Sequence, residues 1–202
     1  MSTRLTVGEA KGAVGDLLEK LAGDEGKEWL RDLKRFLRKE PCWGPPEFNP
    51  WRPLTLGLHK TADLYREALT QAGFKISEWA LHILGKPQFT VATEETEVEL
   101  VVVTVGDLGF PKGAILEQIY TRAKQHGLKL CPPEVGPALR LQYPDQPLGE
   151  WLLIAMEPIT GPDGSPYVFC VGHGDSGRWL RESGGFPRGC WNADCCWVFL
   201  RK

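Results

Sequence analysis

The residues that could do chemistry gather near the carboxyl end of the chain. Cys170, Cys190, Cys195 and Cys196 lie there, and His173 is close to the first of them. Cysteine and histidine can ligate zinc, but structural zinc sites favour cysteine pairs a few residues apart, and the sequence has no C-x-x-C. Adjacent cysteines at 195 and 196 would also point to opposite faces of a strand. We therefore expect no metal site and no cofactor.

Catalysis by the same residues is an alternative. A nucleophilic cysteine needs a nearby base, and no spacing links His173 to a particular thiol. The other histidines, His59, His82 and His126, lie in helical or pre-helical positions. No nucleophile elbow, phosphate loop or dinucleotide fingerprint is present. We expect a protein that is not an enzyme. A small enzyme with a Cys or His–carboxylate site would instead show a concave pocket at His173 or a buried carboxylate with a shifted pKa.

The segment from about 168 to 197 has the composition of a binding surface on a rigid frame. Large apolar residues suited to a frame recur through it and just beyond, at Trp179, Trp191, Trp197 and Phe199. The residues between them are a mixture that packing alone would not select, including cysteines, which are a liability when exposed. The residues expected to form or border the surface are Cys170, Gly172, His173, Arg178, Arg181, Ser183, Phe186, Arg188, Cys190, Cys195 and Cys196.

The tail "GRWLRESGGFPRGCWNADCCWVFLRK" resembles the end of C-type-lectin-fold proteins, in which a Trp-Asn-x-Asp-like turn precedes the last strand. More narrowly, it resembles the variable proteins of diversity-generating retroelements. The resemblance implies that adenine-directed mutagenesis rewrites the C-terminal codons. Such rewriting would account for Cys190, Cys195 and Cys196 without disulfides or metal.

Two further features of the sequence bear on what the resemblance implies. The segment from "LVVVTVGDLGF" to "EWLLIAMEPI" resembles a group of uncharacterised bacterial proteins that differ mainly in their tails. "MEPIT" has Glu-Pro without a following Asn, so the resemblance does not imply calcium-dependent sugar binding. We expect a binding or display protein whose potentially hypervariable surface recognises an unknown ligand, expected to be another protein.

Charge and composition limit the classes of partner that we expect the protein to bind. With 202 residues and a formal net charge of −2, the chain has no bulk attraction for nucleic acid or anionic membranes. No apolar run is long enough to cross a bilayer, and acidic residues interrupt the start where a signal peptide would be apolar. We expect a cytoplasmic protein with free thiols and with no nucleic-acid or membrane partner. The sequence leaves the oligomeric state open.

The elements that must position these residues divide into three regions. Residues 1–40 have the apolar spacing of helices, and "GKEWLRDLKRFLRKEP" places Trp29, Leu33 and Phe36 on one face. Residues 41–57 are proline-rich and predict a linker or strap. An adaptor that binds a partner helix through its N-terminal helices is a further alternative, and it would expose that apolar face.

Residues 58–202 predict an α+β domain resembling the C-type-lectin fold, with a small antiparallel sheet and long loops. Helices are expected in "KTADLYREALTQAGF", where Thr61 would be the N-cap, in "SEWALHILG", where Ser77 would be the N-cap, and in "KGAILEQIYTRAKQHGL". The expected strands are "VELVVVTV", "LRLQY", "EWLLIAMEPI", "YVFCVGH", "RWL" and "WVFLRK".

Overall fold

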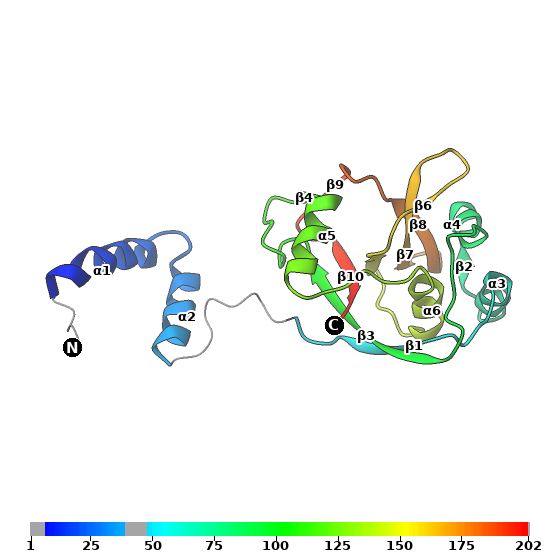
Figure 1. Ribbon diagram of the computed structural model, residues 1–202, viewed down its shortest axis with the longest axis horizontal. Helices are drawn as coiled ribbons and strands as arrows, with labels where there is room; N and C mark the ends of the chain where they lie inside the picture. Colours follow the sequence, from blue (N-terminus) through cyan, green and yellow to red (C-terminus); the bar gives the residue numbers. More distant parts are fainter. Residues whose placement is uncertain (1–6, 39–47, 202) are drawn as a thin grey trace. The chain divides into compact units, whose positions relative to one another are not determined.

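The computed structural model describes residues 7–38 and 48–201, and the chain divides into two compact units, Met1–Glu47 and Phe48–Lys202 (Figure 1). The first unit contains α1 (Val7–Ala22) and α2 (Gly26–Leu37), which form a helical hairpin. The turn between them needs glycine at 26, because a Cβ there would lie 2.1 Å from the Leu21 carbonyl oxygen. Within the described ranges, no helix combines the length and apolar character needed to cross a bilayer.

The second unit is α+β and is built on one large sheet with the strand order β1-β3-β10-β5-β7-β8-β2. Most pairings are antiparallel, but β10 pairs with β5 and β2 pairs with β8 in parallel. The prediction of an antiparallel sheet is confirmed for most pairings, but the sheet is larger than predicted and contains two parallel pairings. The strands on this path are β1 (Arg52–Leu56), β2 (Lys75–Ile76), β3 (Thr96–Thr104), β5 (Trp151–Ile154), β7 (Pro166–Gly174), β8 (Gly177–Gly184) and β10 (Cys196–Leu200).

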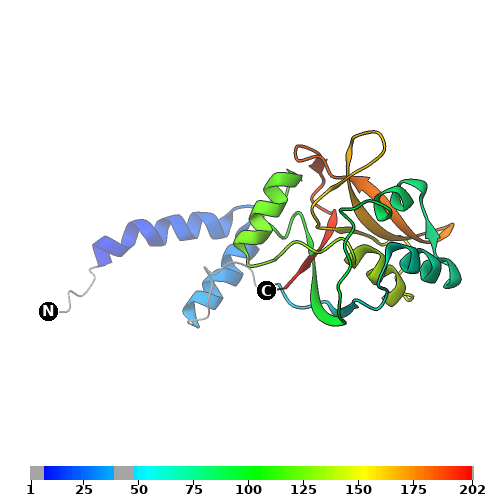
Figure 2. The ribbon, with the colours of Figure 1, turned by 45° about the vertical axis from the view of Figure 1, so that its right-hand side comes forward.

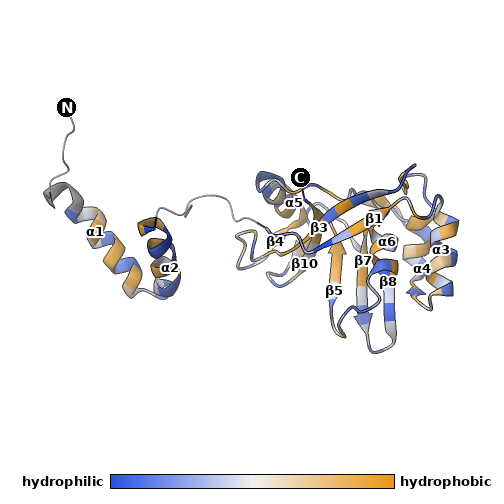
Figure 3. Ribbon diagram, turned by 90° about the horizontal axis from the view of Figure 1, so that it is seen from below, coloured by the Kyte–Doolittle hydropathy of each residue, from blue (hydrophilic) through white to orange (hydrophobic). Residues whose placement is uncertain are grey.

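Helices cover both faces of this sheet. Alternate residues of a strand face opposite sides, and Phe169 of β7 packs against Gly136 of α6 (Val135–Gln142). On the opposite face, Trp197 of β10 meets Tyr120 of α5 (Leu116–Gln125) edge to face, with ring centres 5.7 Å apart. Figures 1 and 3 show α6 grouped with α3 (Ala62–Gln71) and α4 (Glu78–Leu84) beside β7 and β8, with α5 at the other end of the sheet.

Two short pairings lie outside the main strand path. β6 (Ile159–Thr160) pairs with β7 in antiparallel fashion, and the connection between them projects from the sheet (Figure 2). β4 (Ala114–Ile115) pairs with β9 (Cys190–Trp191) just before α5 begins. This second pairing attaches the C-terminal segment to the start of α5.

One predicted strand is a helix. "LRLQY" lies in α6, whose residues Val135–Arg140 are all buried. Burial on every side hides the helical periodicity that an amphipathic helix would show, and the alternation of Leu139 and Leu141 resembles a strand. The burial of Arg140 inside this helix has no signal in the sequence.

The predicted strap also differs from the structure. The compact second unit begins at Phe48, and β1 pairs with β3 at the edge of its sheet. Residues 48–57 therefore belong to the domain, although the sequence placed its start at 58; residues 41–47 lie outside the described part. Pro53 is tolerated in β1 because an edge strand can lack one backbone donor.

Local signals at helix starts are confirmed. The Thr61 hydroxyl accepts a hydrogen bond from the Leu64 amide at 3.2 Å, and the Ser77 hydroxyl accepts one from the Ala80 amide at 3.2 Å. Both are N-caps that satisfy helix amides without an intrahelical partner. Gly73 and Gly127 follow α3 and α5 with positive φ, the conformation in which glycine commonly ends a helix.

Candidate binding surface

The loop at 185–195, here called the C-terminal loop, is held to the domain through its main chain. Its carbonyl oxygens at Pro187 and Gly189 accept hydrogen bonds of 3.0 Å from the amides of Glu117 and Leu116, at the start of α5. These amides are among those that a helix leaves without internal partners. The loop therefore caps α5 with backbone atoms that every residue type provides.

Further main-chain bonds hold both ends of the C-terminal loop. The Gly185 amide donates to the Pro166 carbonyl at 2.8 Å. Near the other end, the Ala193 and Cys195 carbonyls accept from the amides of Gly106 and Val105, at 2.8 and 3.2 Å. The course of the loop is thus fixed at several points without its side chains.

Exposed and half-buried residues alternate from Arg188 to Cys195, after the exposed residues Phe186 and Pro187. Trp191 points inward and meets Trp197 edge to face, with ring centres 4.9 Å apart. The Phe186 side chain is 49% exposed. Substitution at the outward positions removes few contacts with the domain. The exposed residues of the loop are Phe186, Pro187, Arg188, Cys190, Asn192 and Asp194.

A second exposed group lies on the sheet, in a row across four strands, here called the Trp–Arg row. Trp151, Gly172 and Trp179 stand opposite one another on β5, β7 and β8, and Lys75 of β2 stands opposite Trp179. The Arg181 guanidinium lies 5.7 and 5.4 Å from the ring centres of Trp151 and Trp179. The Lys75 ammonium lies 5.2 Å from the Trp179 ring centre. These distances are in the range of cation–π contacts.

Two of the expected surface residues are buried and are corrected here. Cys170 is 6% exposed, because β7 lies between β5 and β8, and burial raises the pKa of its thiol to about 12. Gly172 is buried beneath the Trp151 indole; a Cβ on Gly172 would lie 2.0 Å from that ring. Gly172 therefore supports the Trp–Arg row from below, and neither residue reaches a ligand.

His173 and Arg178 form a third group, near the β7–β8 turn. They stand opposite each other and are half-buried. The His173 Nδ1 lies 2.6 Å from the Gln146 carbonyl oxygen; since a carbonyl only accepts, Nδ1 carries the proton. Among the described residues, the Nε of Arg178 is buried and has no hydrogen-bond partner, while Ser183, further along β8, is half-buried. These residues border the surface more than they form it.

The cysteines of the tail are free thiols, and the structure separates them by exposure. Cys190 is exposed, while Cys195 and Cys196 are half-buried. Burial raises the pKa of both Cys195 and Cys196, and the nearby Asp194 carboxylate adds to this effect. A raised pKa lowers the thiolate fraction that nucleophilic attack requires. Across the described residues, no group of three or more His, Cys, Asp or Glu side chains could hold a metal ion.

The proposed frame residues have two different environments. Trp197 and Phe199 are fully buried in β10. Trp191 is half-buried against Trp197. Trp179 is also half-buried, but its rings face the cations of the Trp–Arg row, and its Nε1 donates to the Ser176 hydroxyl at 3.0 Å. Trp179 therefore belongs to the surface as much as to the frame.

Sequence reasoning missed four residues that extend the candidate surface. Trp151 and Lys75 enter through strand pairings that are distant in sequence, so no local signal marks them. Asn192 and Asp194 alternate with inward-facing neighbours in the C-terminal loop. The alternation around Trp191 could have predicted that Asn192 and Asp194 are exposed.

The buried carboxylate expected of an enzyme does exist, but its contacts are structural. Glu134 is almost fully buried, and its two oxygens accept hydrogen bonds from the Gly57 and Ala92 amides, both at 2.7 Å, and from the Tyr65 hydroxyl at 2.6 Å. Burial and this carboxylate raise the pKa of Tyr65. Glu134 thereby joins α6, α3 and two loops, and its acceptor positions are occupied by the protein itself.

A buried cation lies behind the sheet. The Arg140 guanidinium is fully buried, donates to the Gln146 side-chain oxygen and the Tyr143 carbonyl, and lies 4.7 Å from the Phe74 ring centre. Burial, and then repulsion by Arg178, lower its pKa to about 10. Gln146 in turn donates to the Val171 carbonyl at 3.1 Å, so this network supports β7 from the inner side.

Comparison of the chain with protein-family models, curated proteins and solved structures gave no match. The functional assignment therefore depends on the geometry of the surface.

Proposed function

We propose that the protein is a binding or display protein whose C-terminal loop and Trp–Arg row recognise another protein. The proposal includes a C-type-lectin-like domain of the kind found in the variable proteins of diversity-generating retroelements. The observation that carries it is the main-chain attachment of the C-terminal loop. Backbone bonds fix the loop at Gly185, Pro187, Gly189, Ala193 and Cys195, while exposed side chains alternate between these points.

This arrangement separates stability from recognition. A loop held by its backbone keeps its course when outward side chains change, so those side chains can vary to suit a ligand. Surface substitutions away from caps, cores and special backbone positions usually change stability by less than ~0.5 kcal/mol. The same logic operates in paratopes, where fixed strands carry variable loops.

The residue types favour a protein ligand. Trp, Arg and aromatic side chains provide most of the energy in protein interfaces, and Trp151, Arg181 and Phe186 are exposed. The loop adds a cation, Arg188, and an anion, Asp194. In the described part of the chain, the Arg181 side chain has cation–π contacts but no ion pair, so its guanidinium donors can pair with a ligand carboxylate.

A randomised library tests the separation of frame and surface. Codons 186, 188, 190, 192 and 194 would be randomised, and folded variants scored by resistance to protease on a display platform. We expect most variants to remain folded. The matched control randomises 185, 189, 191, 193 and 195, none of which is exposed, and most of its variants should become protease-sensitive. Equal tolerance in the two libraries, or equal sensitivity, contradicts the proposed frame.

The nucleotide sequence tests the diversification itself. A reverse-transcriptase gene beside this one, with a near-copy of the last hundred or so bases differing only where that copy has adenine, is the expected finding. A tolerant loop without such a near-copy would leave a binding surface that is not diversified.

A specific observation favours a second candidate function, the adaptor. Trp29, Leu33 and Phe36 form an apolar face on α2 that is only partly covered, and the Phe36 side chain is 56% exposed. This is the exposed apolar face that an adaptor would present. The two functions involve different units of the chain and are compatible.

A further inference from the structure

The α1–α2 hairpin carries more apolar surface than its own contacts cover. Of its described side chains, none of the large apolar ones is fully buried, and the exposed fractions of Leu18 and Leu37 are 61% and 69%. Two short helices with this little burial are marginal in water. The hairpin therefore needs a further surface against its apolar residues.

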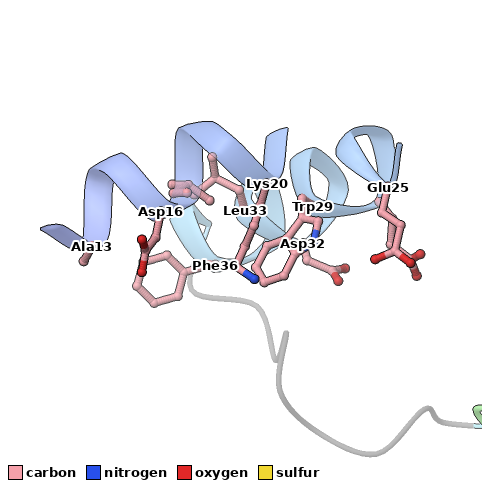
Figure 4. Close-up of a pocket in the computed structure, with 10 residues that line it drawn as sticks. Ala13, Asp16, Lys20, Glu25, Trp29, Asp32, Leu33 and Phe36 are labelled. Carbon is pink, nitrogen blue, oxygen red and sulfur yellow. The ribbon is translucent and has the colours of Figure 1, made fainter. Parts of the chain in front are cut away.

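One face of the hairpin is an apolar groove with acidic edges. Its volume is about 620 Å³, and Figure 4 shows Trp29, Leu33 and Phe36 of α2 along it, with Ala13 of α1. The charged residues that line it are Asp16, Glu25, Glu28, Asp32 and Lys20. Carboxylates thus outnumber cations at the edges.

A second face of α2 has the complementary chemistry. Residues three and four apart share a face of a helix, so Lys27, Leu30, Lys34 and Leu37 form one stripe, here called the Lys–Leu stripe. None of the four lines the groove, and all are exposed. The stripe presents leucines flanked by ammonium groups, which suits an apolar groove with carboxylate edges.

We infer that the hairpins of separate copies assemble head to tail, with the Lys–Leu stripe of one copy seated in the acidic-edged groove of the next. Leu30 and Leu37 would pack on Trp29, Leu33 and Phe36, and Lys27 and Lys34 would pair with the carboxylates of the groove. Groove and stripe are different surfaces of the hairpin, so the contact is heterologous and gives a ring or an open chain.

The groove carboxylates are free to exchange partners. Glu28 and Asp32 contact Arg31 of their own helix at 3.0 and 3.3 Å, but these pairs are exposed to water. Exposed pairs contribute ~0–1 kcal/mol, so they do not prevent pairing with the lysines of a second copy. If the display function holds, the assembly also presents several copies of one surface, which raises avidity.

The test uses the full chain and two variants. One variant has charge changes in the groove, and the other has charge changes in the Lys–Leu stripe. The groove variant is Asp16→Lys with Asp32→Lys, and the stripe variant is Lys27→Glu with Lys34→Glu. Sedimentation velocity at about 50 µM should show the wild type larger than a dimer, and each variant a monomer. Each block should raise the Kd by at least ~tenfold, or ~1.4 kcal/mol.

Mixing the two variants gives the decisive result. The wild-type groove of the stripe variant accepts the wild-type stripe of the groove variant, and the Glu stripe of the first matches the Lys groove of the second. An equimolar mixture should therefore assemble beyond a dimer, although each variant alone is a monomer. A chain with all four changes should assemble again, because its charges are reversed on both sides. Lys112→Glu with Lys124→Glu, two exposed lysines of the other unit, is the matched control and should assemble like the wild type.

A monomeric wild type overturns the inference and leaves the groove to a different partner. A closed dimer whose blocked variants do not complement each other overturns it as well. Either result leaves the display proposal unaffected, because the library and the nucleotide sequence test that proposal separately.

Discussion

At the scale of single residues, the buried groups differ sharply from the exposed ones in what they do. Glu134 and Arg140 are charged, buried and surrounded by donors and acceptors of their own fold. Their charged groups form hydrogen bonds within the fold and are not available to a ligand. Arg181, Arg188 and Cys190 are exposed, and the charges or thiols they offer are open to solvent. The candidate function depends on the second set.

Substitution of Glu134 should be among the most destabilising single changes. In Glu134→Ala, two backbone amides and a tyrosine hydroxyl lose their acceptor, which should cost about 3 kcal/mol or more. Tyr65→Phe is the matched control, since it removes one of the three bonds and should cost about 1 kcal/mol. Urea unfolding followed by tryptophan fluorescence measures both, and equal losses would contradict the shared-acceptor role of Glu134.

The tail cysteines should react in a fixed order. Cys190 is exposed, whereas burial raises the pKa of Cys195 and Cys196 and so lowers their thiolate fraction at neutral pH. Iodoacetamide at neutral pH should label Cys190 first, and the labelling rates of the other two should rise as the pH rises toward their raised pKa. Cleavage before Asp194 separates Cys190 from the other two for mass spectrometry. Faster labelling of Cys195 or Cys196 would indicate an activated thiol and favour an enzyme.

At the scale of elements, the C-terminal loop depends on one distant glycine. Gly113 has a positive φ, and a Cβ on it would lie 2.4 Å from the Trp191 carbonyl oxygen. Gly113 thus allows β4 and β9 to approach each other. We expect the loop to be sensitive at this close contact and tolerant at its exposed side chains.

Two variants should separate these properties. Gly113→Ala should destabilise the protein by about 2 kcal/mol or more, through backbone strain and the contact with Trp191. Replacing Phe186, Arg188, Cys190, Asn192 and Asp194 together with serine should cost less than about 1 kcal/mol, because these side chains face water. Calorimetry gives both values. A larger loss for the serine variant would mean that the loop is held by its side chains.

The elements that sequence predicts well are those with local signals. Thr61 and Ser77 mark the starts of α3 and α4 through their own hydroxyls, and the apolar run of β3 is continuous. Pairing between distant segments has no such signal, so the parallel contacts of β10 with β5 were missed. Arg140 shows the same limit, since the Phe74 ring beside its guanidinium is distant from it in the sequence.

The residues of the candidate surface also divide into those with a local sequence signal and those that depend on distant contacts. Exposure of Phe186, Arg188 and Cys190 could be predicted because their neighbours Pro187 and Trp191 mark turns and anchors. Burial of Cys170 and Gly172 could not, because it requires that β7 lie between two other strands and beneath Trp151.

At the scale of the whole molecule, the two units should be thermodynamically separable. A protein truncated to begin at Phe48 retains every strand of the sheet and its covering helices. We expect its Tm to match that of the full chain, because all the core residues in the described part of the chain lie in the second unit. Scanning calorimetry measures this, and a large drop in Tm would show that the first unit stabilises the second.

The position of β10 in the sheet has a consequence for synthesis. This last strand lies between β3 and β5, so the centre of the sheet stays open until the ribosome has passed codon 200. A nonsense codon or frameshift anywhere in the C-terminal loop would delete β10 and leave a product open to proteolysis. Only a chain translated in frame through β10 can therefore complete the sheet.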